Sequence, residues 1–74
     1  MKWRLIVRST RSWEVFVKDG SYIIEQHKVS GWFEVHTRMR GFVRADTREG
    51  IEQFIREDVL AYERSRGNEQ GTQD

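Results

Sequence analysis

The sequence lacks cysteine, proline and any long run of apolar residues. Without cysteine the chain can form no disulfide and offers no thiolate ligand to a metal ion, and it leans towards a reducing compartment. No apolar run approaches the ~18 residues that a membrane-spanning helix requires, and the first residues lack the apolar region of a signal peptide. These absences predict a cytoplasmic protein that does not contact a membrane.

The chain is also short, because 74 residues make one domain at most. A core of this size contributes only roughly 3 to 5 kcal/mol of net stability, and small domains often rely on a staple or a partner. Since disulfides are excluded, a second copy of the chain is the remaining option, and a homodimer is one expected form.

The charges are nearly balanced overall but unevenly placed, with a formal net charge of +1. Residues 1–48 hold ten basic and five acidic side chains, a net of +5, whereas residues 49–74 hold three and seven, a net of −4. This asymmetry indicates either a polyanionic partner for the first part or attraction between the two parts.

The stretch from residue 46 to residue 66 has the periodicity of an amphipathic helix. Its apolar residues follow the spacing that forms a single stripe along one side. They are Ile51, Phe54, Ile55, Val59 and Tyr62. Asp46 is the predicted N-cap, with Glu49 three residues later, and Gly67 is the predicted helix end. The folded domain then comprises residues 1–67, and the polar residues 68–74 are expected to form a disordered tail.

Two residues break the helical pattern. Asp58 falls inside the apolar stripe between Phe54 and Tyr62, whereas Leu60 falls on the polar side. Asp58 either has a buried partner, such as an arginine or a tryptophan N–H group, or lies at the edge of the stripe because the helix is slightly rotated. We favour the second interpretation, and we interpret Leu60 as a lone exposed leucine.

The first 45 residues alternate between apolar and polar side chains, which predicts β-strands. Four strands are expected at residues 2–8, 13–18, 21–29 and 32–39, and we allow for a short fifth strand at 42–45. Asp19-Gly20 and Ser30-Gly31 are the predicted two-residue turns, and residues 10–12 are the predicted first loop. The predicted fold is α+β: a four-stranded antiparallel β-meander with one C-terminal helix packed on one face.

The predicted turns define the strand pairing, which sorts the side chains between the two faces of the sheet. In this register Val7 pairs with Val15, and Val17 pairs with Tyr22. One face collects most of the large apolar side chains and is expected to carry the helix. This face comprises Trp3, Leu5, Val7, Trp13, Val15, Val17, Tyr22, Ile24, Phe33, Val35 and Met39.

The opposite face is the candidate binding surface, since no predicted element remains to cover it. It carries an apolar row flanked by basic residues, and exposed apolar groups rimmed by charge are typical of contact sites. The candidate interface residues are Ile6, Phe16 and Ile23, and the candidate nucleic-acid contacts are Arg4, Lys18, Arg38, Arg40 and Trp32.

The two histidines, together with nearby glutamates, could bind a metal ion or act in acid-base catalysis. In the predicted register, however, His27 lies opposite Glu34 and His36 opposite Glu25, which are ordinary cross-strand charge pairs. A flat sheet face offers no pocket, and the chain has no phosphate loop or nucleophile elbow. We therefore expect no metal, no cofactor and no enzymatic activity.

Several short motifs in the second half resemble known families. They are the tryptophan-containing segment 31–35, Gly41-Phe42, the threonine-containing helix start at 46–49 and the apolar stretch 51–54. In this order they resemble the arm-type DNA-binding domains at the N-termini of phage integrases, and also the strand-to-helix passage of HicB-type antitoxins. Each resemblance covers less than half of the chain. The extra basic hairpin of the first family and the proline-containing turn of the second are missing, and Gly50 stands where both commonly have alanine.

Two functions follow as expectations. The first is a small non-enzymatic protein that binds nucleic acid through the open sheet face, with basic side chains at phosphates and Phe16 or Trp32 as a stacking surface. The weak net charge counts against it. The alternative is a protein-interaction module, either a homodimer through the apolar row or a phage-like regulator that binds and inhibits a host protein.

Overall fold

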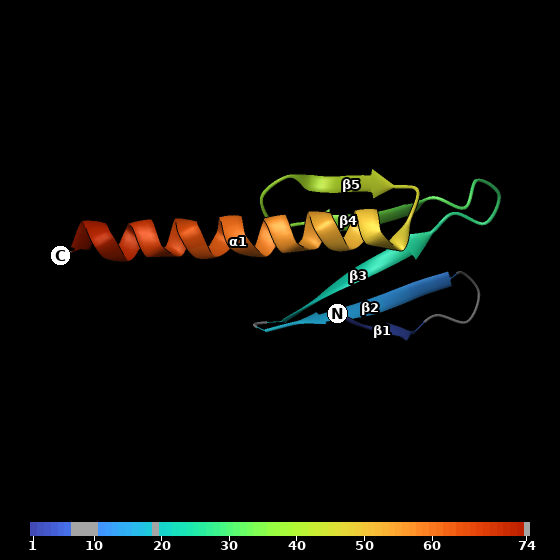
Figure 1. The fold of residues 1–74 in the computed structure, drawn as a ribbon, viewed down its shortest axis with the longest axis horizontal. Coiled ribbons are helices and arrows are strands. Elements are labelled where there is room, and N and C mark those ends of the chain that lie inside the picture. The colour runs from blue at the N-terminus through green and yellow to red at the C-terminus, as the bar shows by residue number, and fades with distance from the viewer. Residues whose placement is uncertain (7–10, 19, 74) are drawn as a thin grey trace.

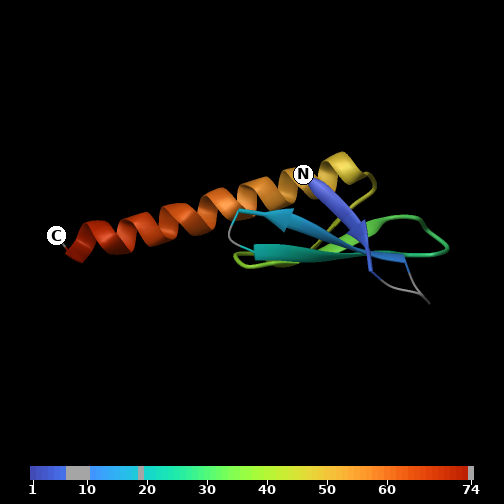
Figure 2. The same cartoon turned by 90° about the horizontal axis from the view of Figure 1, so that it is seen from below.

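Five strands and one helix make up the structure, a computed structural model that describes residues 1–6, 11–18 and 20–73. One antiparallel sheet contains, in sequence order, β1 (Lys2–Leu5), β2 (Arg11–Val17), β3 (Gly20–Gln26), β4 (Phe33–Thr37) and β5 (Gly41–Ala45). The helix α1 (Arg48–Gln73) lies against one face of this sheet and projects beyond it (Figure 1, Figure 2). The predicted α+β meander with one helix is confirmed, and its fifth strand has five residues.

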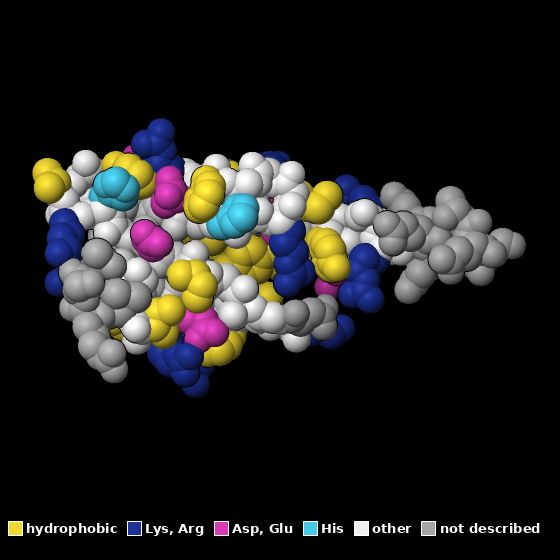
Figure 3. Space-filling view, turned by 180° about the vertical axis from the view of Figure 1, so that it is seen from behind, with side chains coloured by type: hydrophobic (Ala, Val, Ile, Leu, Met, Phe, Trp, Pro, Cys, Tyr) yellow, Lys and Arg dark blue, Asp and Glu magenta, His cyan; other side chains and the backbone are white. Residues whose placement is uncertain are grey.

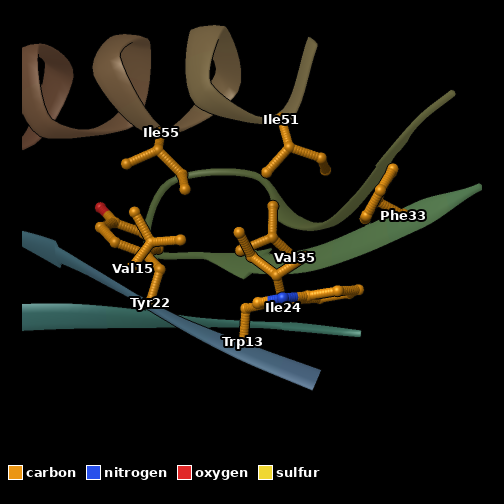
Figure 4. Close-up of a cluster of buried hydrophobic side chains, with 8 residues drawn as sticks. All are labelled: Trp13, Val15, Tyr22, Ile24, Phe33, Val35, Ile51 and Ile55. Carbon is orange, nitrogen blue, oxygen red and sulfur yellow. The ribbon is translucent and has the colours of Figure 1, made fainter. Parts of the chain in front are cut away.

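The core forms between α1 and the helix-facing side of the sheet (Figure 4). Ile51 and Ile55 of α1 are completely buried there. They meet side chains of the three inner strands, as the period-two alternation predicts. The sheet contributes Trp13, Val15, Tyr22, Ile24, Phe33 and Val35. Burying each large aliphatic side chain is worth roughly 1.5 to 3 kcal/mol, so this cluster is the main source of stability.

Two described residues predicted for the core face, Leu5 and Met39, do not join the core. Leu5 is 58% exposed because it lies on β1, at one edge of the sheet. The helix α1 makes its main contacts with β4 and β5, at the other edge. Met39 is 50% exposed because it lies in the turn between β4 and β5. Val7 lies outside the described residues.

The strand pairing differs from the predicted register by two or four residues in each of the first three hairpins. Val17 lies opposite Gly20 rather than Tyr22, and the partner of Val15 on β1 is Trp3. An even shift keeps the side chains of the paired strand residues on their predicted face, because the faces alternate with a period of two. The prediction of the core face therefore survives a wrong register.

The hairpin between β3 and β4 shows why the turn prediction is wrong. Instead of a two-residue turn at Ser30-Gly31, the loop spans residues 28–31. The His27 N–H group donates to the Trp32 carbonyl at 2.9 Å, and the Gly31 N–H group donates to the His27 carbonyl at 2.9 Å. Gly31 has a φ of 79°, which glycine adopts without a side-chain clash. The same glycine therefore fits either loop length, and the local sequence does not choose between them.

The helix begins one residue later than predicted. The N-cap is Thr47, whose hydroxyl accepts a hydrogen bond from the Gly50 N–H group at 3.1 Å. Its carbonyl accepts the first helical hydrogen bond, from the Ile51 N–H group at 3.2 Å. The capping role predicted for Asp46 together with Glu49 is therefore wrong.

The other end of the helix also differs from the prediction. α1 continues through Gly67 to Gln73, so Gly67 keeps the helical backbone and does not end the helix. A glycine ends a helix when it turns left-handed, and its mere presence does not force that conformation. The division into a domain at residues 1–67 and a disordered tail at 68–74 stays a prediction.

Asp58 is a buried carboxylate with 4% of its surface exposed, so the favoured interpretation of an edge residue is wrong. It accepts hydrogen bonds from the Tyr22 hydroxyl and from the backbone N–H groups of Arg38 at 3.0 Å and Met39 at 2.8 Å. Burial by itself raises the pKa of Asp58, but these hydrogen bonds and the Arg38 charge outweigh burial and hold that pKa below its ordinary value. Asp58 thus joins α1 to β3 and to the β4–β5 turn.

Candidate interaction surface on the open face of the sheet

The sheet face opposite α1 carries no other described element and forms a broad surface of mixed chemistry (Figure 3). Alternation along each strand sends every second side chain to this face, and strand pairing aligns these side chains in rows. The middle row consists of Arg4, Glu14 and Ile23, which face one another on β1 to β3, and His36 faces Phe42 on β4 and β5. This open face is the candidate functional surface.

Four apolar side chains on the open face are exposed to solvent. Phe42 is 69% exposed, and Ile6, Phe16 and Ile23 are between 40% and 47% exposed. The predicted interface residues therefore lie on this face, but they do not form one row. Ile6 neighbours Ser12, whose carbonyl accepts its N–H group at 3.0 Å, whereas Phe16 lies on the other side of the middle row. Phe42 was not among the predicted site residues.

Rings on β4 and β5 and in the adjoining loop form two stacked pairs. The ring centres of His27 and Trp32 are 3.6 Å apart, and those of His36 and Phe42 are 4.5 Å apart with planes inclined by 16°. The guanidinium carbon of Arg44 lies 4.7 Å from the centre of the Trp32 ring, a cation–π contact. Each of these rings therefore packs against a neighbour in its own chain, and the Trp32 ring has two such neighbours.

The predicted histidine–glutamate pairs are wrong. The shifted pairing of β3 with β4 places Glu25 opposite Glu34 and leaves both histidines stacked on aromatic rings. Like charges that face each other across two strands are unfavourable, and Arg44, which lies opposite Glu34 on β5, offsets them. Among the described residues, no group of three potential ligands lies close enough to hold a metal ion.

The predicted nucleic-acid contacts do not assemble into one basic row. Arg4 is on the open face, where it forms an ion pair with Glu14 and lies 5.3 Å from the centre of the Phe16 ring. Trp32 is on the same face but half-buried. Lys18 is exposed and follows β2 in the β2–β3 turn.

Arg38 and Arg40 turn towards α1 instead of the open face. The guanidinium carbon of Arg38 lies 4.7 Å from the centre of the Tyr62 ring, and Arg40 forms an ion pair with Glu57 at 3.4 Å. The cause is Asp58, which binds the backbone of the β4–β5 turn and draws it against the helix. Sequence reasoning missed this because the hydrogen-bond donors to Asp58 come from distant parts of the chain.

The charges on the strand positions of the open face cancel. These positions include three basic and three acidic side chains, which are Lys2, Arg4 and Arg44, and Glu14, Glu25 and Glu34. Among the residues that the structure describes, the basic excess of residues 1–48 therefore does not gather on the strands of this surface.

The chain matches no known family. No family model, curated protein or solved structure shows significant similarity to it. The resemblances to integrase arm-type domains and HicB-type antitoxins thus gain no support, and the surface is interpreted from its geometry. Among the described residues, no helix is both long and apolar enough to cross a membrane.

Proposed function

We propose that the protein is a small non-enzymatic module that binds another protein through the open face. The observation that carries this proposal is the exposure of Phe42, at 69%, together with that of Ile23 and Phe16 on the same uncovered face. Apolar patches of this kind mark contact sites, and the centres of protein interfaces are enriched in aromatic residues and arginine. Trp32 and Arg44 on the β4–β5 half of the face fit that composition. A cytoplasmic location remains part of the proposal.

Charge and ring geometry favour a protein over a nucleic acid on this face. Binding to phosphates requires an excess of lysine and arginine, whereas the strand positions of the open face carry three basic and three acidic side chains. Nucleic-acid bases stack on aromatic rings that present a free face. The ring of Trp32, one of the predicted stacking residues, already has both the His27 ring and the Arg44 guanidinium against it.

Nucleic-acid binding is a second candidate, at the end of the sheet where α1 projects. The guanidinium carbons of Arg38 and Arg66 lie 4.7 and 5.8 Å from the centre of the Tyr62 ring. A Cβ atom at Gly20 would lie 3.2 Å from the Arg38 guanidinium, so the β2–β3 turn with Lys18 is at the same end. A tyrosine beside two arginines suits a single-stranded nucleic acid. Acidic residues of α1 neutralise part of this charge, which makes it the weaker candidate.

Matched variants test the open-face proposal. Ile23→Asp and Phe16→Asp each place a negative charge on the open face. Leu60→Asp, the control, places the same charge at a 58% exposed position of α1. We expect wild-type protein and the Leu60→Asp control to capture the same protein from an extract of the source cells. Both open-face variants should capture at least tenfold less of that protein, and their circular dichroism spectra should show an unchanged fold. Retention by both variants would contradict the proposal.

The same variants decide between the two candidates when titrated with a labelled duplex and a labelled single strand at two salt concentrations. The open-face proposal predicts no salt-sensitive complex. The second candidate predicts a salt-sensitive complex that is lost in the double variant Arg38→Ala with Arg66→Ala and persists in Ile23→Asp. That result would place the function at the end of the sheet where α1 projects, with a nucleic acid as the partner.

A further inference from the structure

The two edges of the sheet differ in their protection against pairing. An edge strand exposes backbone N–H and C=O groups, and proteins commonly guard such edges with short strands, lysine or proline. β1 follows this pattern, because it has four residues and carries Lys2 and Arg4. β5 is less protected, because it carries one basic residue, Arg44, contains no lysine or proline, and exposes 69% of Phe42.

The outer edge of β5 is open in the part of the chain that the structure describes. One side of β5 pairs with β4 along its whole length, and no described strand pairs with the other side. Figure 1 shows β5 as the outermost strand, and α1 does not extend past it. Val43 and Ala45 pack against the core from this strand, so a strand added here would extend both the sheet and the apolar layer under α1.

We propose that β5 pairs antiparallel with β5 of a second copy of this chain, with Val43 on the two-fold axis. In this register the strand is complementary to itself. The small residues Gly41 and Ala45 face each other at both ends, and Phe42 faces the second copy's Arg44 twice. An aromatic ring beside a guanidinium is a favourable cross-strand pair.

This pairing has a defined geometry. The two-fold axis is perpendicular to the sheet, so both helices lie on one side and both open faces form one continuous surface on the other. Five strands from each copy then make one sheet. Pairing through five residues gives a small interface, for which we expect a dissociation constant on the order of 10 to 100 µM. Pairing of two copies deepens the proposed function, because it doubles the open-face surface offered to a partner. The pairing itself does not depend on the proposed function.

Single-cysteine variants test the pairing directly, because the natural chain has no cysteine. Val43→Cys brings two thiols together across the axis, where the Cα atoms of facing residues are about 4.5 to 5.5 Å apart. We expect this variant to form a covalent dimer under mild oxidation, whereas Leu60→Cys stays monomeric. Cross-linking of Ile23→Cys without that of Val43→Cys would mean that the open faces meet each other, which would overturn the edge pairing.

Two charge variants test the register without cysteine. Phe42→Arg places a like charge opposite the second copy's Arg44, whereas Phe42→Glu places an opposite charge there, and both variants lose the same ring. We expect sedimentation equilibrium to show association weakened tenfold or more for Phe42→Arg and preserved within a few-fold for Phe42→Glu. Equal losses in the two variants, or a wild type that stays monomeric at about ten times the expected dissociation constant, would overturn the proposal.

The outcome is separable from that of the proposed function. Ile23→Asp, which tests partner binding on the open face, is expected to leave self-association unchanged. If the β5 edge instead binds an extended segment of another protein, Val43→Cys will stay monomeric, and Phe42→Arg will lose that protein while Ile23→Asp keeps it. This result would overturn pairing with a second copy.

Discussion

At the scale of single residues, Asp58 decides how the helix and the sheet meet. A carboxylate inside an apolar stripe is unfavourable unless donors surround it, and three donors from β3 and the β4–β5 turn do so. The same hydrogen bonds draw Arg38 and Arg40 to the helix side. One buried carboxylate thereby removes two basic side chains from the open face, which leaves that face without a net charge on its strands.

Tyr22→Phe removes one of the three donors to Asp58 and keeps the two backbone donors. We expect it to reduce the free energy of unfolding by about 1.5 to 3 kcal/mol at neutral pH, as loss of a buried hydrogen bond to a charged group does. Urea denaturation of the variant and the wild type measures this difference.

The same variant makes a prediction about pH. Because the pKa of Asp58 is lowered in the folded protein, its stabilising contribution is present above the ordinary pKa, near 4, and is lost as the pH falls through the folded-state value. Burial, the hydrogen bond to Asp58 and the charge of Asp58 raise the pKa of Tyr22 to about 12, so the wild type also loses stability above about pH 10. The difference in the free energy of unfolding between wild type and Tyr22→Phe should therefore narrow at both low and high pH. A gap that does not change with pH would contradict this account.

At the scale of elements, the end of β5 and the first turn of α1 approach closely. A Cβ atom at Gly50 would lie 2.8 Å from the Cβ atom of Ala45, which is closer than two such atoms approach in proteins. Gly50 is therefore needed to let the helix return over the sheet directly after the Thr47 cap. This contact gives a physical reason for a glycine at this position.

Gly50→Ala tests this close approach. Replacing glycine by alanine inside a helix normally gains about 1 kcal/mol, but here we expect a loss of about 1 kcal/mol or more because the methyl group meets Ala45. Gly67→Ala, in the same helix, is the matched control and should gain stability. Adding Ala45→Gly to Gly50→Ala should recover part of the loss in thermal unfolding. A gain from Gly50→Ala alone would show that the two elements move apart at little cost.

At the scale of the whole molecule, a small core supports an elongated shape with extents of 51 × 19 × 17 Å. Most of the length comes from α1, which projects past the sheet (Figure 2). The described core consists of only eight buried apolar residues. Total stability on the order of 3 to 5 kcal/mol therefore depends on each of them.

Ile55→Ala probes this dependence. Ile55 is completely buried, and replacing such a residue by alanine costs about 2 to 5 kcal/mol, so we expect most of the variant to be unfolded at 25 °C. Leu60→Ala, at a 58% exposed position of the same helix, should change stability by less than about 0.5 kcal/mol. Circular dichroism and urea denaturation measure both. A well-folded Ile55→Ala protein would show that another source, such as self-association, supplies much of the stability.

The sequence by itself determined the fold class, the helix and the face to which most strand residues point. Period-two alternation and the helical stripe are local, and they survive an even shift in strand register. Phe42 could have been placed on the open face in the same way, because it alternates with Val43 in the fifth strand.

Only the tertiary structure decided the strand register, the hydrogen bonds of Asp58 and the final place of the basic residues. A glycine with positive φ fits turns of both two and four residues, so the local sequence does not choose between them. Asp58 lies 36 residues from Tyr22 and 20 from Arg38, and no local pattern links such partners. The surface that we propose for binding is therefore shaped by contacts that form only when helix and sheet pack together.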